Sequence, residues 1–194
     1  GTIAFSVSGI TPTIGELTAP AKNFGDAAFS LTAPTSDSSG AFTYDSSNTA
    51  VATVTSGGTV TVVGAGSTTI TATQDASGNY TGGSVTASLV VSPIAPTFGA
   101  FTVTAKNFGD ASFNLTAPTS DSDGAFSYTS SAPAVATVTS DGTVTVVGAG
   151  TTTITATQAA SADGNYTTGD ISGSLVVSPI VPTFGAFTVT AKNF

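Results

Sequence analysis

Residues 50–72 read Ala-Val-Ala-Thr-Val-Thr-Ser-Gly-Gly-Thr-Val-Thr-Val-Val-Gly-Ala-Gly-Ser-Thr-Thr-Ile-Thr-Ala, with apolar and polar residues alternating through most of the stretch. Glycine-containing turns separate three runs, 50–54, 58–62 and 66–72. A period of two with β-branched residues predicts strands that bury one face and expose threonine on the other. No window has the apolar period of an amphipathic helix, so we expect an all-β protein.

This stretch occurs twice in the chain. Residues 53–74 and 137–158 differ at only two of twenty-two positions, and the identity extends to positions expected to face solvent. Folding alone does not require that identity. We infer recent duplication within a longer array of near-copies.

A second motif gives the length of the repeat. Lys22-Asn-Phe-Gly-Asp26 recurs from Lys106, 84 residues later, and starts again at Lys192 after a further 86. The two extra residues precede Asn165, and an insertion of this kind predicts an exposed loop.

Aligning the copies predicts four parts. Residues 1–11 are the last strand of a preceding repeat, 12–95 and 96–181 are whole repeats, and 182–194 are the first strand of a following repeat. We expect either that the polypeptide continues in both directions or that these terminal strands complete repeats in neighbouring chains by strand addition.

Each repeat holds about seven short alternating runs separated by Gly- and Ser-rich turns. This pattern predicts immunoglobulin-like Greek-key β-sandwiches of two sheets. The expected core of the first repeat consists of large apolar residues on the inward positions: Phe29, Leu31, Phe42, Tyr44, Val51, Val54, Val60, Val62, Ile70, Tyr80, Leu89 and Val91.

Composition removes most catalytic chemistry. The chain has no His and no Cys, so it offers no imidazole base, no thiolate and no ordinary zinc ligand set. The net charge is −8 and only 7% of the residues are charged, so we expect no basic surface that would attract nucleic acid or anionic lipid. The apolar runs are far shorter than a spanning helix needs, so we expect no membrane insertion in this segment.

The segments Ala50–Val54, Gly58–Val62 and Gly66–Ala72, and their second copy from Ala134 to Ala156, resemble the group 2 bacterial Ig-like domains. Such domains build the rods of invasin- and intimin-type adhesins and of many large repetitive surface proteins. The resemblance covers essentially the whole chain. It implies an extracellular, cell-surface setting and a part in cell adhesion, although fold does not fix activity.

Two loops have residue spacings that resemble those of ligand-binding loops. Asp121-Ser-Asp123-Gly124 has a fragment of a calcium-loop spacing, but the first copy, Asp37-Ser-Ser-Gly40, loses one carboxylate. We therefore favour turn chemistry and leave calcium as the alternative; no other cofactor is expected. Gly64-Ala-Gly66 superficially resembles a phosphate loop, but a strand follows it, so we expect a tight strand connection.

Lys22 and Lys106 are the only cations of their repeats. We expect each to pair on the surface with the aspartate four residues later, an interaction worth ~0 to 1 kcal/mol. The alternative is an isopeptide crosslink to an asparagine such as Asn79 or Asn165, which a mass loss would reveal. The aspartates expected to pair with Lys22 and Lys106 are Asp26 and Asp110, respectively.

Three segments fit the N-glycosylation acceptor pattern, namely Asn79-Tyr-Thr81, Asn114-Leu-Thr116 and Asn165-Tyr-Thr167. Outward threonines on strands explain most of the hydroxyl content without sugar, and glycosylation stays open.

Phenylalanines lie beside prolines at the junctions between repeats. We expect them to clamp adjacent repeats at a fixed angle, so that the array is a semi-rigid rod. These residues are Phe98, Phe101, Phe184 and Phe187.

The leading prediction is a structural, non-catalytic array that forms the stalk of an adhesin or the shaft of an extracellular filament. Its partners are neighbouring repeats, through lateral or strand-complementing contacts that gain avidity by repetition. A glycan- or protein-binding module and spacer repeats of a larger secreted enzyme are the alternatives.

Overall fold

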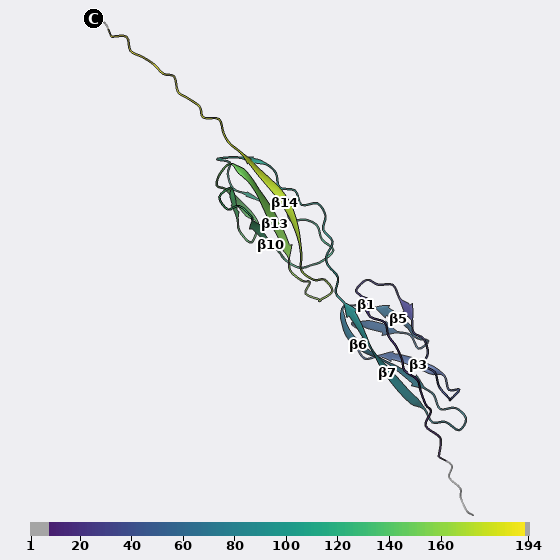
Figure 1. Ribbon diagram of the computed structural model, residues 1–194. Coiled ribbons are helices and arrows are strands. Elements are labelled where there is room, and N and C mark those ends of the chain that lie inside the picture. The colour runs from purple at the N-terminus through teal and green to yellow at the C-terminus, as the bar shows by residue number, and fades with distance from the viewer. Residues whose placement is uncertain (1–7, 193–194) are drawn as a thin grey trace, which may run out of the picture. The chain divides into compact units, whose positions relative to one another are not determined.

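The computed structural model describes residues 8–192. The chain divides into two compact units: unit 1 ends at Pro96 and also includes residues 160–168, whereas unit 2 comprises 97–159 and the residues from 169 onward. Among the described residues both units are built from strands without helices (Figure 1). The all-β prediction is confirmed.

Unit 1 has seven strands in its described part. They form a four-stranded sheet in the order β1-β7-β6-β3 and a three-stranded sheet in the order β2-β5-β4. β1 runs parallel to β7, and the remaining pairs are antiparallel. The strands are β1 (Lys22–Asn23), β2 (Phe29–Ser30), β3 (Phe42–Ser46), β4 (Ala52–Val54), β5 (Thr59–Val62), β6 (Gly66–Gln74) and β7 (Gly83–Ser92).

Unit 2 repeats this topology. Its sheets have the orders β10-β13-β14-β8 and β11-β12-β9, and β8 is parallel to β14. The strands are β8 (Lys106–Asn107), β9 (Phe113–Asn114), β10 (Phe126–Ser130), β11 (Ala136–Val138), β12 (Thr143–Val146), β13 (Gly150–Gln158) and β14 (Gly169–Ser178). Successive strands change sheet repeatedly, as the Greek-key prediction requires.

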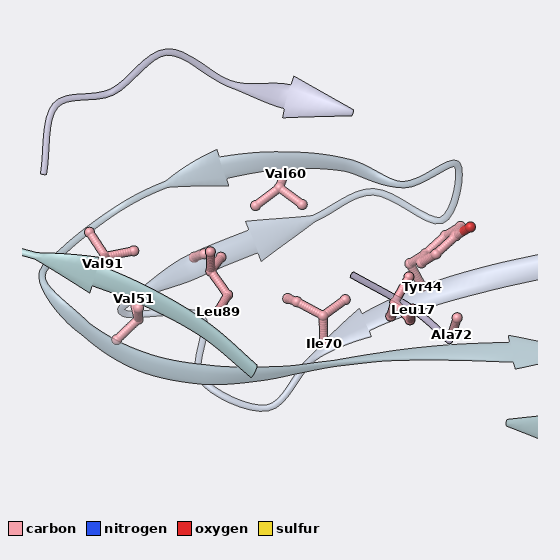
Figure 2. Packing of buried hydrophobic residues seen from close by; sticks show 9 residues of the cluster. Leu17, Tyr44, Val51, Val60, Ile70, Ala72, Leu89 and Val91 are labelled. Carbon is pink, nitrogen blue, oxygen red and sulfur yellow. The ribbon is translucent and has the colours of Figure 1, made fainter. Parts of the chain in front are cut away.

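The core of unit 1 lies between its two sheets. Figure 2 shows the labelled side chains gathered in this space, most of them from strands of the two sheets, and Ile70 and Leu89 are fully buried there. Along β6 the inward positions are buried while Thr69 and Thr73 face solvent. The alternation read from the sequence therefore predicted the inward face correctly.

Most of the predicted core residues pack in this cluster, either buried or partly buried. Tyr80 is an exception, because it is half-buried outside the cluster and its backbone pairs with Ile10. The prediction also missed Leu17, which is 6% exposed; its counterpart in unit 2, Phe101, is 8% exposed. Both lie before the first strand, where no regular alternation marked them.

A polar side chain lies inside each core. Gln74, 2% exposed, accepts a hydrogen bond from Ser36 Oγ at 2.7 Å and donates through Nε2 to the carbonyls of Ser38 at 3.1 Å and Gly40 at 2.9 Å. Gln158 makes the corresponding three bonds in unit 2. The glutamine thereby satisfies loop groups that burial would otherwise leave without partners.

Residues 160–168 belong to unit 1 by their contacts, although the sequence repeat places them in 96–181. The described part of 182–194 is exposed and forms no strand, and most of 1–11 lies outside the described residues. The limits 12–95 and 96–181, and the roles given to both terminal segments, stay predictions.

Candidate functional site

In the loop with the calcium-like spacing, the first aspartate is held by hydrogen bonds from another segment of the protein. Asp121 accepts hydrogen bonds from Thr97, from the backbone N at 2.8 Å and from Oγ1 at 2.6 Å. The Thr97 hydroxyl and backbone bonds lower the pKa of the Asp121 carboxyl. In unit 1, Asp37 accepts from Thr13 N at 2.8 Å. Each aspartate thus ties the segment that enters its unit to the loop before β3 or β10.

Within residues 8–192 no cluster of three or more Asp, Glu, His or Cys is arranged to hold a metal ion. Calcium at this loop stays an untested alternative, with Asp121 already engaged by Thr97.

Within the described residues, Lys22 and Lys106 do not make the expected ion pairs. Lys22 Nζ lies 4.6 Å from the centroid of the Phe29 ring, a cation–π geometry, while Asp26 Oδ2 accepts from the backbone N of Asn23 at 2.9 Å. The two groups have different partners, so the predicted surface pairing is wrong. The counterparts in unit 2 are Lys106 at 4.5 Å from Phe113, and Asp110 accepting from Asn107 at 2.8 Å.

The Gly64-Ala-Gly66 segment is the tight connection between β5 and β6, as predicted. Gly64 N donates to the carbonyl of Val51 at 3.1 Å, and Gly66 has φ of 140°. The intervening Ala65 N–H has no strand partner. It donates instead to the side-chain Oδ1 of Asn165 at 2.7 Å.

Asn165 is held in place by its own loop, residues 160–168. Asp163 accepts from the Asn165 backbone N at 2.9 Å and from its Nδ2 at 2.7 Å. Ser161 Oγ donates to Asp163 at 2.6 Å and accepts from Tyr166 N at 2.9 Å. These bonds leave Asn165 Oδ1 directed at Ala65, and Asn165 is only 9% exposed.

Two further contacts fasten the same loop within unit 1. The rings of Tyr166 and Phe24 meet edge to face, with centroids 5.5 Å apart and an interplanar angle of 76°. Ile94 pairs with the loop as a short parallel bridge, in which Ile94 N donates to Asn165 O at 3.1 Å and Thr167 N donates to Ile94 O at 2.8 Å. We call Phe24, Gly64 and Ala65 the acceptor surface of unit 1.

The loop 75–81 of the first repeat makes the equivalent bridge at its own base. Ile10 N donates to Asn79 O at 2.8 Å, and Thr81 N donates to Ile10 O at 2.8 Å. Its Asn79 side chain, however, is exposed. A hollow of about 460 Å³ lies beside it, lined by Ser8, Gly9, Ile10, Gly78, Asn79 and Tyr80.

The three glycosylation patterns differ in accessibility. Asn79 and Asn114 are exposed, although Asn114 Oδ1 accepts from Thr143 Oγ1 at 3.0 Å. Asn165 is buried and its amide is bonded to Asp163. Of the three, Asn165 is therefore the least suited to carry a sugar or to reach a lysine.

Two of the four junction phenylalanines contact aromatic residues of unit 2. Phe101 is part of its core, with its ring centroid 6.1 Å from that of Tyr128 in a tilted arrangement, and the Phe98 centroid lies 6.0 Å from that of Phe126. These two rings thus have aromatic partners within unit 2, and the clamp between adjacent repeats stays a prediction. Phe184 and Phe187, in contrast, are more than nine-tenths exposed.

Sequence reasoning missed the contact of the 160–168 loop with the acceptor surface. The signal available was Gly-Asn-Tyr-Thr, which both loops keep although two residues are inserted directly before the second copy. Nothing in the sequence indicated that Phe24 and Ala65 would receive it.

The two sheets, their strand order and their central core define an immunoglobulin-like sandwich. The family model described as the immunoglobulin-like domain of intimin matches residues 26–79 and 114–160, more than half of the chain. The chain belongs to this family of adhesin-type domains.

Solved structures to which the chain is similar include human protocadherin-24 EC1-2, with a TM-score of 0.36 at 15% identity over 86% of this chain and 98% of that chain. Drosophila N-cadherin EC1-4 gives 0.33 at 12% identity, over 87% of this chain and 50% of that one. Domains 1–6 of the surface layer protein SbsC give 0.34 at 19% identity, over 82% and 24%.

A comparison with curated proteins gave no match. In the part of the chain that the structure describes, no helix is long and apolar enough to cross a membrane.

Proposed function

We propose that this chain is a structural, non-catalytic part of a repeat array that forms the stalk or shaft of an extracellular bacterial adhesin or filament. The observation that carries the proposal is that near-identical sequences build two units, each with seven described strands and a core of its own. Membership of the intimin immunoglobulin-like family supports the extracellular, adhesive setting.

The chemistry of the surface also supports a structural role. The chain lacks His and Cys, and the carboxylates Asp121 and Asp163 are engaged in turns. Small-ligand sites are usually concave and lined with apolar and aromatic side chains. Three hollows in the described residues are instead lined mostly by Thr, Ser, Gly and Ala.

Electron microscopy of the native assembly tests this proposal. We expect uniform fibres or stalks whose axial repeat corresponds to one or two copies of the sequence repeat. A glycan array with the purified chain serves as the second arm, and we expect no binding. Isolated compact particles that bind sugars specifically would instead favour the glycan-binding alternative.

A further inference from the structure

The acceptor surface of unit 1 has a counterpart in unit 2 with the same residues. Phe24, Gly64 and Ala65 correspond to Phe108, Gly148 and Ala149. We call the latter three the second acceptor surface.

The two surfaces have the same backbone. Gly66 has φ of 140° and its counterpart Gly150 has 146°. Gly64 N and Gly148 N each donate to a valine carbonyl at 3.1 Å, Val51 and Val135 respectively. The second acceptor surface is therefore already formed, and binding a loop there would need little reorganisation.

The two surfaces differ in what covers them. In unit 1 Phe24 is half-buried and Gly64 buried, because Asn165 and Tyr166 lie against them. In unit 2 Phe108 is 44% exposed, and Ala149 is exposed as well. Among residues 8–192 the Ala149 N–H has no protein hydrogen-bond partner, whereas Ala65 N–H donates to Asn165 Oδ1.

The sequence identifies what would cover the second surface. Residues 182–194 repeat residues 96–108 without a difference, which predicts that they begin another copy of the repeat that carries the Gly-Asn-Tyr-Thr loop. Ile180, the counterpart of Ile94, is 58% exposed and offers a backbone edge for the same parallel bridge.

We infer that Phe108, Gly148 and Ala149 bind the Asn-Tyr loop of a further copy of this repeat, with the Asn side chain accepting from Ala149 N–H and the Tyr ring packing on Phe108. This inference deepens the proposed array and rests on it, since both require further copies. The exposed Asn79 is the same group at the other position, available to a preceding copy.

The contact has a chemical reason to recur. A turn amide without a strand partner needs an acceptor, and an asparagine oxygen fixed by its own loop supplies one without a charge. An aromatic pair adds a preferred edge-to-face orientation. Together, the hydrogen bond and the aromatic pair make the contact specific for one loop and one turn. Nonspecific apolar packing would not have this specificity.

The test is hydrogen exchange of single amides by NMR. The chain is extended at its C-terminus by a second copy of residues 109–178, which completes the repeat begun at 182. We expect Ala149 N–H to exchange about tenfold more slowly in the extended chain. Replacing the asparagine that corresponds to Asn165 with alanine in the added copy should restore the original rate.

The matched pair in the unextended chain is Asn165→Ala and Asn79→Ala. We expect Asn165→Ala to speed exchange of Ala65 N–H about tenfold and Asn79→Ala to leave it unchanged. Equal rates in these two variants would overturn the inference, even if the added copy did not fold.

Protected amides in the strands of the added copy will show whether that copy is folded. If it is folded and Ala149 N–H still exchanges at the original rate, the inference is also overturned. That result would not contradict the shaft proposal, because fibres can form through other contacts between repeats. Microscopy that finds no fibre or stalk would count against the shaft proposal alone.

Discussion

At the scale of single residues, a buried glutamine organises each sandwich. Gln74 lies at the end of β6 with 2% exposure, and its amide bonds to one hydroxyl and two carbonyls of the loop before β3. Gln158 has the same position in unit 2. Because all three loop groups depend on one side chain, the glutamine couples loop conformation to the core.

Replacing Gln74 by leucine should therefore destabilise unit 1 by about 1–3 kcal/mol, the cost of leaving buried polar groups without partners. Urea unfolding of the full chain measures this change. Thr73→Val on the exposed face of the same strand is the control and should stay within about 0.5 kcal/mol. Equal stability of the two variants would mean that water replaces the glutamine without cost.

At the scale of elements, the hairpin between β4 and β5 depends on one glycine. Gly58 has φ of 87° and donates to the carbonyl of Thr55 at 2.9 Å, and its own carbonyl accepts from Leu31 N at 2.9 Å. A Cβ at this position would lie 3.1 Å from Cε2 of Tyr44. The turn therefore needs glycine both for its conformation and for the aromatic ring packed on it.

We expect Gly58→Ala to lower the free energy of unfolding by about 1–3 kcal/mol, because alanine must adopt a left-handed conformation against the Tyr44 ring. Gly57→Ala is the matched control, since a Cβ there would meet only Thr55 Oγ1, at 4.0 Å. It should change stability by less than about 0.5 kcal/mol. Denaturant midpoints for both variants decide the matter, and a tolerated Gly58→Ala would contradict the assignment.

At the scale of the whole molecule, the chain holds two cores. Ile70 and Leu89 are fully buried in the first, as are Ile154 and Leu175 in the second. Each unit buries its apolar face within its own pair of sheets. A cavity-creating substitution in one core should therefore leave the packing of the other core intact.

Calorimetry of Ile154→Ala tests this independence. The cavity should destabilise unit 2 by about 2–5 kcal/mol, so that its transition moves to lower temperature and separates from that of unit 1. Val176→Ala, on the exposed face of β14, should leave the thermogram close to the original. A single transition that moves as a whole in Ile154→Ala would show that the two cores unfold together.

The sequence by itself determined the long alternating strands and which of their residues face inward. Alternation in β6 and β12 is local information, because successive side chains of a strand point to opposite faces. It failed at Leu17, which lies before the first strand, and at Tyr80, whose environment is a loop pairing with Ile10.

Only the tertiary structure decided the polar partners. Lys22 lies over Phe29, where sequence proximity suggested Asp26, and Asn165 caps an amide 100 residues away in the chain. A hydrogen bond requires particular atoms at particular distances, and those are set only when the sheets have packed. Residue pattern fixes the face that a side chain occupies, whereas the folded chain fixes the group that it meets there.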